Sequence, residues 1–216
     1  MVLSSIGCAM GVDRVQLLDP MKYSLVKKDA PVTEPPIVQV EKKPIEVVFE
    51  KVRDNRTDIS CIGVKKNSYG IPMGRVELVQ GVVLVDEFKK NLIDAFALAG
   101  FEQMNTHTVS ETTEGNVQPK NVVVDAEIRT FWVEFMPGLF VVDALGNVIF
   151  EVRIYDRETH RELMSEMFRG TAKVSGAFVT RGMFEKSINE AYAHAMQQMY
   201  HYLAKPSDDT FVRKIQ

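Results

Sequence analysis

Charged side chains that could bind a ligand gather in the segment Asp54-Asn55-Arg56-Thr57-Asp58. Two carboxylates with an arginine between them could hold a small ligand or an ion. The same pattern is typical of turns that are closed by Asx hydrogen bonds and a local ion pair. A polar loop does not by itself establish a site. The turn is therefore the favoured interpretation of Asp54, Arg56 and Asp58, and a ligand loop is the alternative.

Residue types used in catalysis are present but are not spaced for it. His194 and His201 fall on a predicted helix about 10 Å apart along its axis, too far to share a metal ion. The segment 70–74 lacks the Gly-Lys-Ser/Thr ending of a phosphate loop. Cys61 has no evident histidine partner and is interpreted as a buried small hydrophobic residue. The sequence predicts a protein that is not an enzyme, with no metal and no cofactor.

Cys8 is the residue with the most specific predicted chemistry, because it resembles a lipidation site. Ile6 and Gly7 suit the two positions before a lipidated cysteine, whereas Ser5 replaces the usual leucine. The stretch before Cys8 is also shorter than a complete signal peptide. Two interpretations follow: the remnant of a lipoprotein signal whose true start lies upstream, or a terminus that contains a cysteine by chance.

The segment after Cys8 favours the lipoprotein interpretation. Residues 9–44 show little periodic pattern and contain several prolines, which favour extended backbone. They are predicted to form a tether between an anchored cysteine and a folded domain. Residues 1–8 would then be the signal remnant, residues 45–205 a single domain, and residues 206–216 a polar tail.

Composition narrows the class of protein. The chain has 216 residues, of which 45% are hydrophobic and 25% charged, with a formal net charge of -3. These fractions are ordinary for a globular protein. Because the cations are scattered among acidic residues, the sequence argues against nucleic-acid binding. The longest strongly apolar candidate, 82–85, is far shorter than the ~20 residues that cross a bilayer.

The predicted elements define a mixed fold. Apolar residues at helical spacing predict helices over 85–99 and 184–202. Strands are predicted over 45–52, 59–64, 122–135, 139–142, 148–155 and 161–173, with a loop at 67–74 and a hairpin turn at 143–147. Connections of this kind predict an α+β fold, a largely antiparallel sheet with two long amphipathic helices packed on one face.

The last helix is rich in methionine and tyrosine on more than one side. The favoured interpretation is a packed core face. The alternative is a second apolar face presented to a partner. If the chain has a protein interface on this helix, we expect it at Tyr192, Met196, Met199 and Tyr200.

Several short motifs together resemble a known family. They are Val52-Arg53-Asp54-Asn55-Arg56, then Ile62-Gly63-Val64-Lys65-Lys66-Asn67 with Tyr69-Gly70, and a helix that closes on Ala99-Gly100-Phe101. Over residues 45–135 this looks like the YajG-type family of bacterial lipoproteins. The resemblance implies a periplasmic protein, anchored to the outer membrane, without known catalytic residues.

The leading hypothesis is therefore a non-catalytic envelope lipoprotein that serves as a binding or scaffold module. Its expected partners are the membrane, through the lipid on Cys8, and another envelope protein, with self-association left open. One alternative is a structural subunit of a larger secretion or motility assembly in the envelope. The other is a cytoplasmic ligand-binding domain to which Cys8 is irrelevant.

Overall fold

The computed structural model describes residues 11–23, 42–43, 45–67, 69–103, 120–138 and 141–204. Within these residues the chain forms an eight-stranded sheet and two helices. Their bounds, in chain order, are β1 Gly11–Val15, β2 Ile45–Asp54, β3 Gly63–Lys66, β4 Pro72–Leu78, α1 Leu84–Leu98, β5 Glu102–Gln103, β6 Lys120–Pro137, β7 Val142–Asp156, β8 Glu162–Gly176 and α2 Arg181–Ala204.

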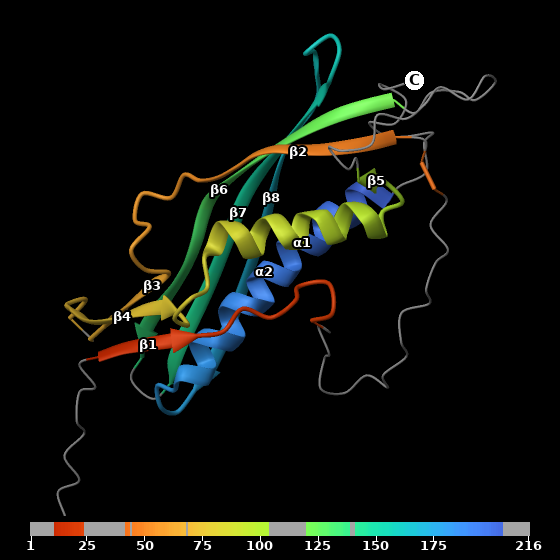
Figure 1. The fold of residues 1–216 in the computed structure, drawn as a ribbon. Coiled ribbons are helices and arrows are strands. Elements are labelled where there is room, and N and C mark those ends of the chain that lie inside the picture. Colours follow the sequence, from red (N-terminus) through yellow and green to blue (C-terminus); the bar gives the residue numbers. More distant parts are fainter. Residues whose placement is uncertain are drawn as a thin grey trace, which may run out of the picture.

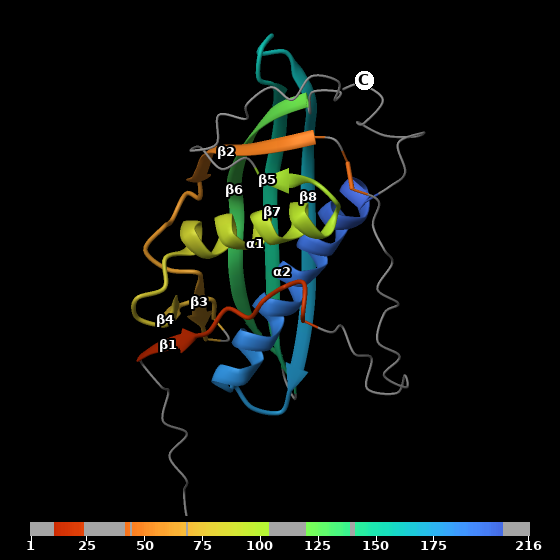
Figure 2. The same ribbon diagram turned by 45° about the vertical axis from the view of Figure 1, so that its right-hand side comes forward.

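The long strand β6 organises the sheet. On one side it pairs with β2 along its first part and with β3 near its end, and on the other side it pairs with β7. Strand β7 pairs in turn with β8, while β4 and β1 continue the sheet from β3. Figures 1 and 2 show a curled sheet with both helices on the same face.

The predicted α+β class with both helices on one face is confirmed, but the prediction of a largely antiparallel sheet is wrong. Parallel pairing joins β1 with β4, β2 with β5, β2 with β6, and β3 with β6. The antiparallel pairs are β3 with β4, β6 with β7, and β7 with β8. Between β2 and its parallel neighbours β5 and β6 the chain forms β3 and β4 and then crosses the sheet face through α1, and such a crossover produces parallel neighbours. Alternation along a strand does not reveal which strand lies beside it.

The first helix matches its prediction closely. Gly100 follows α1 with a φ of 89°, the left-handed conformation that glycine adopts without strain. The N–H of Gly100 donates to the carbonyl of Ala97, and that of Phe101 donates to the carbonyl of Phe96. This is a Schellman ending. The rings of Phe96 and Phe101 lie 5.3 Å apart between centroids, so the turn also starts the next strand in the core.

Two glycines let α2 lie directly on the sheet. A Cβ added at Gly146 in β7 would collide with the carbonyl oxygen of Ser187, and one at Gly170 in β8 with that of Ala191.

The hairpin turn predicted at 143–147 is wrong, because these residues lie inside β7, and the chain turns between Pro137 and Val142 instead. Gly146 is required for close packing against the helix, not for a turn.

The N-terminal segment also differs from its prediction. Residues 11–23, within the range expected to be a tether, belong to the folded domain. Strand β1 pairs with β4, whose first three residues lie in the predicted loop 67–74. Buried Asn189 then holds the next residues on α2: its Oδ1 accepts from the N–H of Leu18 at 2.8 Å, and its Nδ2 donates to the carbonyl of Gln16 at 2.8 Å. Sequence periodicity missed β1 because a five-residue edge strand carries too few apolar positions.

Neither helix in the described part of the chain combines the length and apolarity needed to cross a membrane.

Candidate functional site

Asp54 and Arg56 form a nearly buried ion pair at the end of β2. The guanidinium donates from Nε to Asp54 Oδ1 and from Nη2 to Asp54 Oδ2, both at 2.8 Å. Its Nη1 donates to the carbonyl of Cys61 at 3.0 Å and to that of Phe131 at 3.4 Å. One arginine therefore ties the loop to β6. These contacts are those of the turn that was the favoured interpretation of Asp54 and Arg56.

Asp58 closes the next part of the same loop. Its Oδ1 accepts from the backbone N–H of Ser60 at 2.9 Å and from the Ser60 hydroxyl at 2.6 Å. The hydrogen bond from that hydroxyl, followed by that from the Ser60 backbone, lowers the pKa of the exposed Asp58 carboxyl. Asp58 and Arg56 also line a small recess of ≈ 240 Å³ against the outer side of β6.

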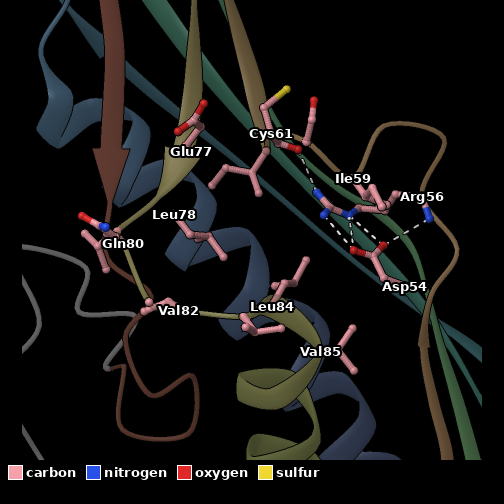
Figure 3. A pocket seen from close by; sticks show the side chains of 15 residues that line it. Asp54, Arg56, Ile59, Cys61, Glu77, Leu78, Gln80, Val82, Leu84 and Val85 are labelled. Atoms are coloured by element: carbon pink, nitrogen blue, oxygen red, sulfur yellow. Dashed lines mark hydrogen bonds and ion pairs between the residues drawn. The ribbon is translucent and has the colours of Figure 1, made fainter.

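A larger pocket lies on the other side of this loop. It has a volume of ≈ 500 Å³ and is formed by the loop after β2, the end of β4, and the connection into α1. Figure 3 shows Asp54 and Arg56 facing each other at one side, with Glu77 and Gln80 at the other. Its aliphatic lining comes from Ile59, Ile62, Leu78, Val79, Val82, Val83, Leu84 and Val85.

The pocket is suited to holding an apolar group. Two of its aliphatic side chains are strongly exposed, Ile59 at 68% and Val83 at 56%. The nearby guanidinium is already engaged by Asp54 and by carbonyl groups, so the polar rim supplies orientation to a ligand more readily than reactive chemistry. Pockets with aliphatic walls and few polar groups are the usual form of a binding site.

Sequence reasoning missed this pocket, although one signal was present. The run 82–85 is strongly apolar yet far too short to cross a membrane, which leaves its apolar side chains without an assigned role in the sequence. It lies at the start of α1. An amphipathic helix buries only one face in the core, so the apolar residues of this run that lie on its other face stay exposed. Leu84 is buried, whereas Val83 is exposed and available to line the pocket.

The last helix presents mainly a packed core face, which was the favoured interpretation, so the alternative of an interface at Tyr192, Met196, Met199 and Tyr200 is corrected. Tyr192, Met196 and Met199 are at most 1% exposed, and Tyr200 is partly buried against the same cluster. The Tyr192 hydroxyl accepts from Asn91 Nδ2 on α1 at 3.0 Å. Burial raises the pKa of Tyr192 well above its usual range. Apolar residues appear on several sides of α2 because it contacts the sheet, α1 and the N-terminal segment at once.

The remaining predicted site residues add no further chemistry. Cys8 lies outside the described residues. Cys61 is a free, buried thiol. Among the described residues, no group of three or more His, Cys, Asp and Glu side chains is arranged to hold a metal ion.

Comparisons with known proteins give a set of distant structural neighbours. No family model matches the chain, and no curated protein matches its sequence. A protein from Xanthomonas campestris of the DUF330 family aligns over 79% of this chain and 89% of its own, with 10% identity and a TM-score of 0.49. A Helicobacter pylori protein described as a putative neuraminyllactose-binding hemagglutinin homolog aligns over 83% and 95%, with 14% identity and a TM-score of 0.41.

A lipoprotein from Neisseria meningitidis aligns over 73% of this chain and 99% of its own, with 11% identity and a TM-score of 0.34. All three similarities are too weak to assign the chain a family or a function. The YajG-type resemblance therefore stays an expectation from its motifs.

Proposed function

We propose that this chain is a non-catalytic lipoprotein of the bacterial envelope, anchored through Cys8, that binds an apolar segment of an envelope partner. The observation that carries the binding role is the pocket between the loop after β2 and the start of α1, whose exposed Ile59 and Val83 stand at its mouth. The Ile6-Gly7-Cys8 motif and the resemblance of residues 45–135 to YajG-type lipoproteins support the envelope location.

The pocket has features that suit binding rather than turnover. Its position is set by a salt bridge of 2.8 Å between Arg56 and Asp54 and by hydrogen bonds from Arg56 to two carbonyl groups. A guanidinium held in this way keeps the loop rigid, so less conformational entropy is lost when a partner binds. Aliphatic walls gain free energy by being removed from water, about 25 cal/mol for each Å² that is buried.

Mass spectrometry of the N-terminal peptide from native membranes tests the anchor. A diacylated or triacylated Cys8 is the expected result. An unmodified peptide that retains Met1 contradicts the lipoprotein proposal.

Site-specific photocrosslinking tests the pocket. A photoreactive residue at position 83 should give one dominant adduct in intact cells. The same residue at Lys90, on the exposed side of α1, is the matched control and should give none. The variant Ile59→Asp, in the chain that carries the crosslinker at 83, should abolish the adduct because it places a charge in the apolar mouth. Equal crosslinking from both positions contradicts a binding role for the pocket.

A further inference from the structure

One end of the sheet gathers exposed apolar side chains from four separate segments. Strand register places these segments together. Pro137 pairs with Val142, and Val142 pairs with Gly176, so the β6–β7 turn and the β8–α2 connection are adjacent. Strand β3 runs parallel to the last part of β6, so its turn into β4 points to the same end.

The start of β1 lies at this end as well. Gly11 pairs with Gly74, near the beginning of β4. Figure 1 shows the start of β1, the β3–β4 turn and the β8–α2 connection toward the lower left of the molecule, with the β7–β8 turn at the opposite end. We call the end that contains Gly11 the loop end. Its exposed apolar residues are Val12 at 51%, Tyr69 at 89%, Ile71 at 56%, Met136 at 51%, Val141 at 48%, Phe178 at 80% and Val179 at 44%.

The opposite end of the same strands shows that this clustering is not a general property of the turns. The β7–β8 turn consists of Asp156, Arg157, Glu158, Thr159, His160 and Arg161. The Asp156 carboxylate accepts from the N–H of Glu158 at 3.1 Å and of Thr159 at 2.9 Å, which closes the turn with polar contacts. One end of the sheet therefore carries polar and charged side chains in a turn closed by polar contacts, whereas the other end exposes aromatic and aliphatic side chains.

The position of Cys8 indicates what covers the loop end. Only three residue steps separate Cys8 from Gly11, the first residue of β1. A chain of that length reaches at most ~11 Å. A lipid on Cys8 would therefore hold the loop end at the bilayer surface, because residues 11–23 belong to the domain and do not act as a spacer.

We infer that the loop end docks on the lipid surface, with Tyr69, Ile71, Phe178 and Val179 entering the headgroup region. Tyrosine is enriched at the membrane interface, and phenylalanine and aliphatic side chains enter the boundary between headgroups and acyl chains. The inference rests on the proposed envelope location and adds the orientation of the domain. The pocket lies at the far end of β4 from the β3–β4 turn, so it stays open to a partner when the loop end meets the membrane.

Vesicle flotation of the full chain carrying Cys8→Ser tests this surface without any lipid anchor. Vesicles of phosphatidylcholine are the probe, and measurable binding is expected. The double variant Tyr69→Asp/Phe178→Asp should lower the partition coefficient roughly tenfold or more, because binding strength follows the apolar area that enters the membrane and the variant removes two large apolar side chains. Leu98→Asp/Met167→Asp is the matched control: both residues are more than half exposed but lie away from the loop end, so less than a twofold change is expected.

Salt gives an internal check on the same assay. Because the proposed contacts are uncharged, raising the ionic strength should leave binding within twofold, unlike attraction to charged headgroups. No flotation of the Cys8→Ser chain, or equal losses in both double variants, overturns the proposal.

Tryptophan fluorescence provides a second readout that does not depend on a loss of binding. In a Trp132→Phe background, a tryptophan replacing Phe178 should shift to shorter wavelength with vesicles and be quenched by brominated lipid. One replacing Leu98 should do neither. Matching responses at both positions contradict the inference. The anchor is judged separately: an unmodified Cys8 in native membranes removes the lipoprotein proposal, whereas vesicle binding by the Cys8→Ser chain decides the docking surface.

Discussion

The two faces of the β6–β7–β8 sheet are made by alternate residues of the same strands, yet one face is a packed apolar core and the other is a polar surface of ion pairs. On the helix side, Phe150 is fully buried and its ring lies 5.0 Å from that of Phe88 on α1 and 5.6 Å from that of Phe168, measured between centroids. On the outer side, its neighbour Glu151 accepts from Arg129 Nη2 at 2.7 Å and from Arg153 Nε at 2.6 Å.

This difference shows where the stability of the fold resides. Side chains on the helix side are removed from water and closely packed, so a substitution that changes their volume lowers the free energy of unfolding strongly. Ion pairs on the outer side remain partly hydrated, and such pairs contribute at most about 1 kcal/mol each. Substitutions at paired positions on the two faces should therefore differ by several-fold in their effect on the free energy of unfolding.

The largest expected contrast is between Phe150→Ala and Ile149→Ala. Removing the buried ring should lower the free energy of unfolding by about 3–5 kcal/mol, because it leaves a cavity between α1 and the sheet. Ile149 is the next residue and lies on the outer face, where truncation should cost under about 1 kcal/mol. Urea denaturation measures both. Equal costs would mean that the outer face is covered by a further element.

The next contrast is between Gly170→Ala and Thr171→Ala. A methyl group at Gly170 meets the backbone of α2 at Ala191 and Ala195, so the helix must move away from β8. We expect a loss of about 2–3 kcal/mol, at the upper part of the range for overpacking. Thr171 is exposed on the outer face, and its change should lie within about 0.5 kcal/mol. Thermal unfolding of the two variants distinguishes them, and a neutral Gly170→Ala would show that the helix can shift freely.

A smaller contrast concerns amide side chains. Asn189→Ala on α2 should cost about 1–2 kcal/mol, because the carbonyl of Gln16 and the N–H of Leu18 both lose their hydrogen-bond partner. Hydrogen exchange should show faster exchange at the Leu18 amide. Asn147 faces the outer side, and its Oδ1 has no hydrogen-bond partner within the described part of the chain, so Asn147→Ala should be nearly neutral. Unchanged exchange at Leu18 would contradict the role given to Asn189.

The smallest effect is expected from the ion pairs themselves. Hydrogen bonds from Arg153, and then from Arg129, lower the pKa of Glu151 from 4.5 to about 2. Because this pKa is lowered by folding, its stabilisation is present above pH 4.5 and is lost as the pH falls toward 2. Glu151→Gln should cost under about 1 kcal/mol at pH 6 and less at pH 3. Urea midpoints at both pH values measure the change, and a difference that does not shrink in acid contradicts it.

Local sequence patterns located several secondary-structure elements of this protein accurately. The apolar spacing of Phe88, Leu92 and Phe96 with Gly100 behind it defined α1 because a helix and its Schellman ending depend on contacts within a few residues. Alternation likewise located the strand that became β6. The same local physics predicts the turn at Asp54, Arg56 and Asp58, where Arg56 bonds to Asp54 and Asp58 bonds to Ser60; the link from Arg56 to the carbonyl of Phe131 on β6 depends on the tertiary structure.

Only the tertiary structure decided how these pieces face one another. The parallel pairing of β2 with β6, the use of Gly146 for helix packing, and the burial of Tyr192 and Met196 all depend on residues distant in the chain. The pocket at Val83 and the apolar loop end also depend on the tertiary structure, because the amino-acid type at a position does not show whether its side chain is exposed or buried. Local propensity selects a conformation for each segment, whereas exposure is set by which other segments cover it.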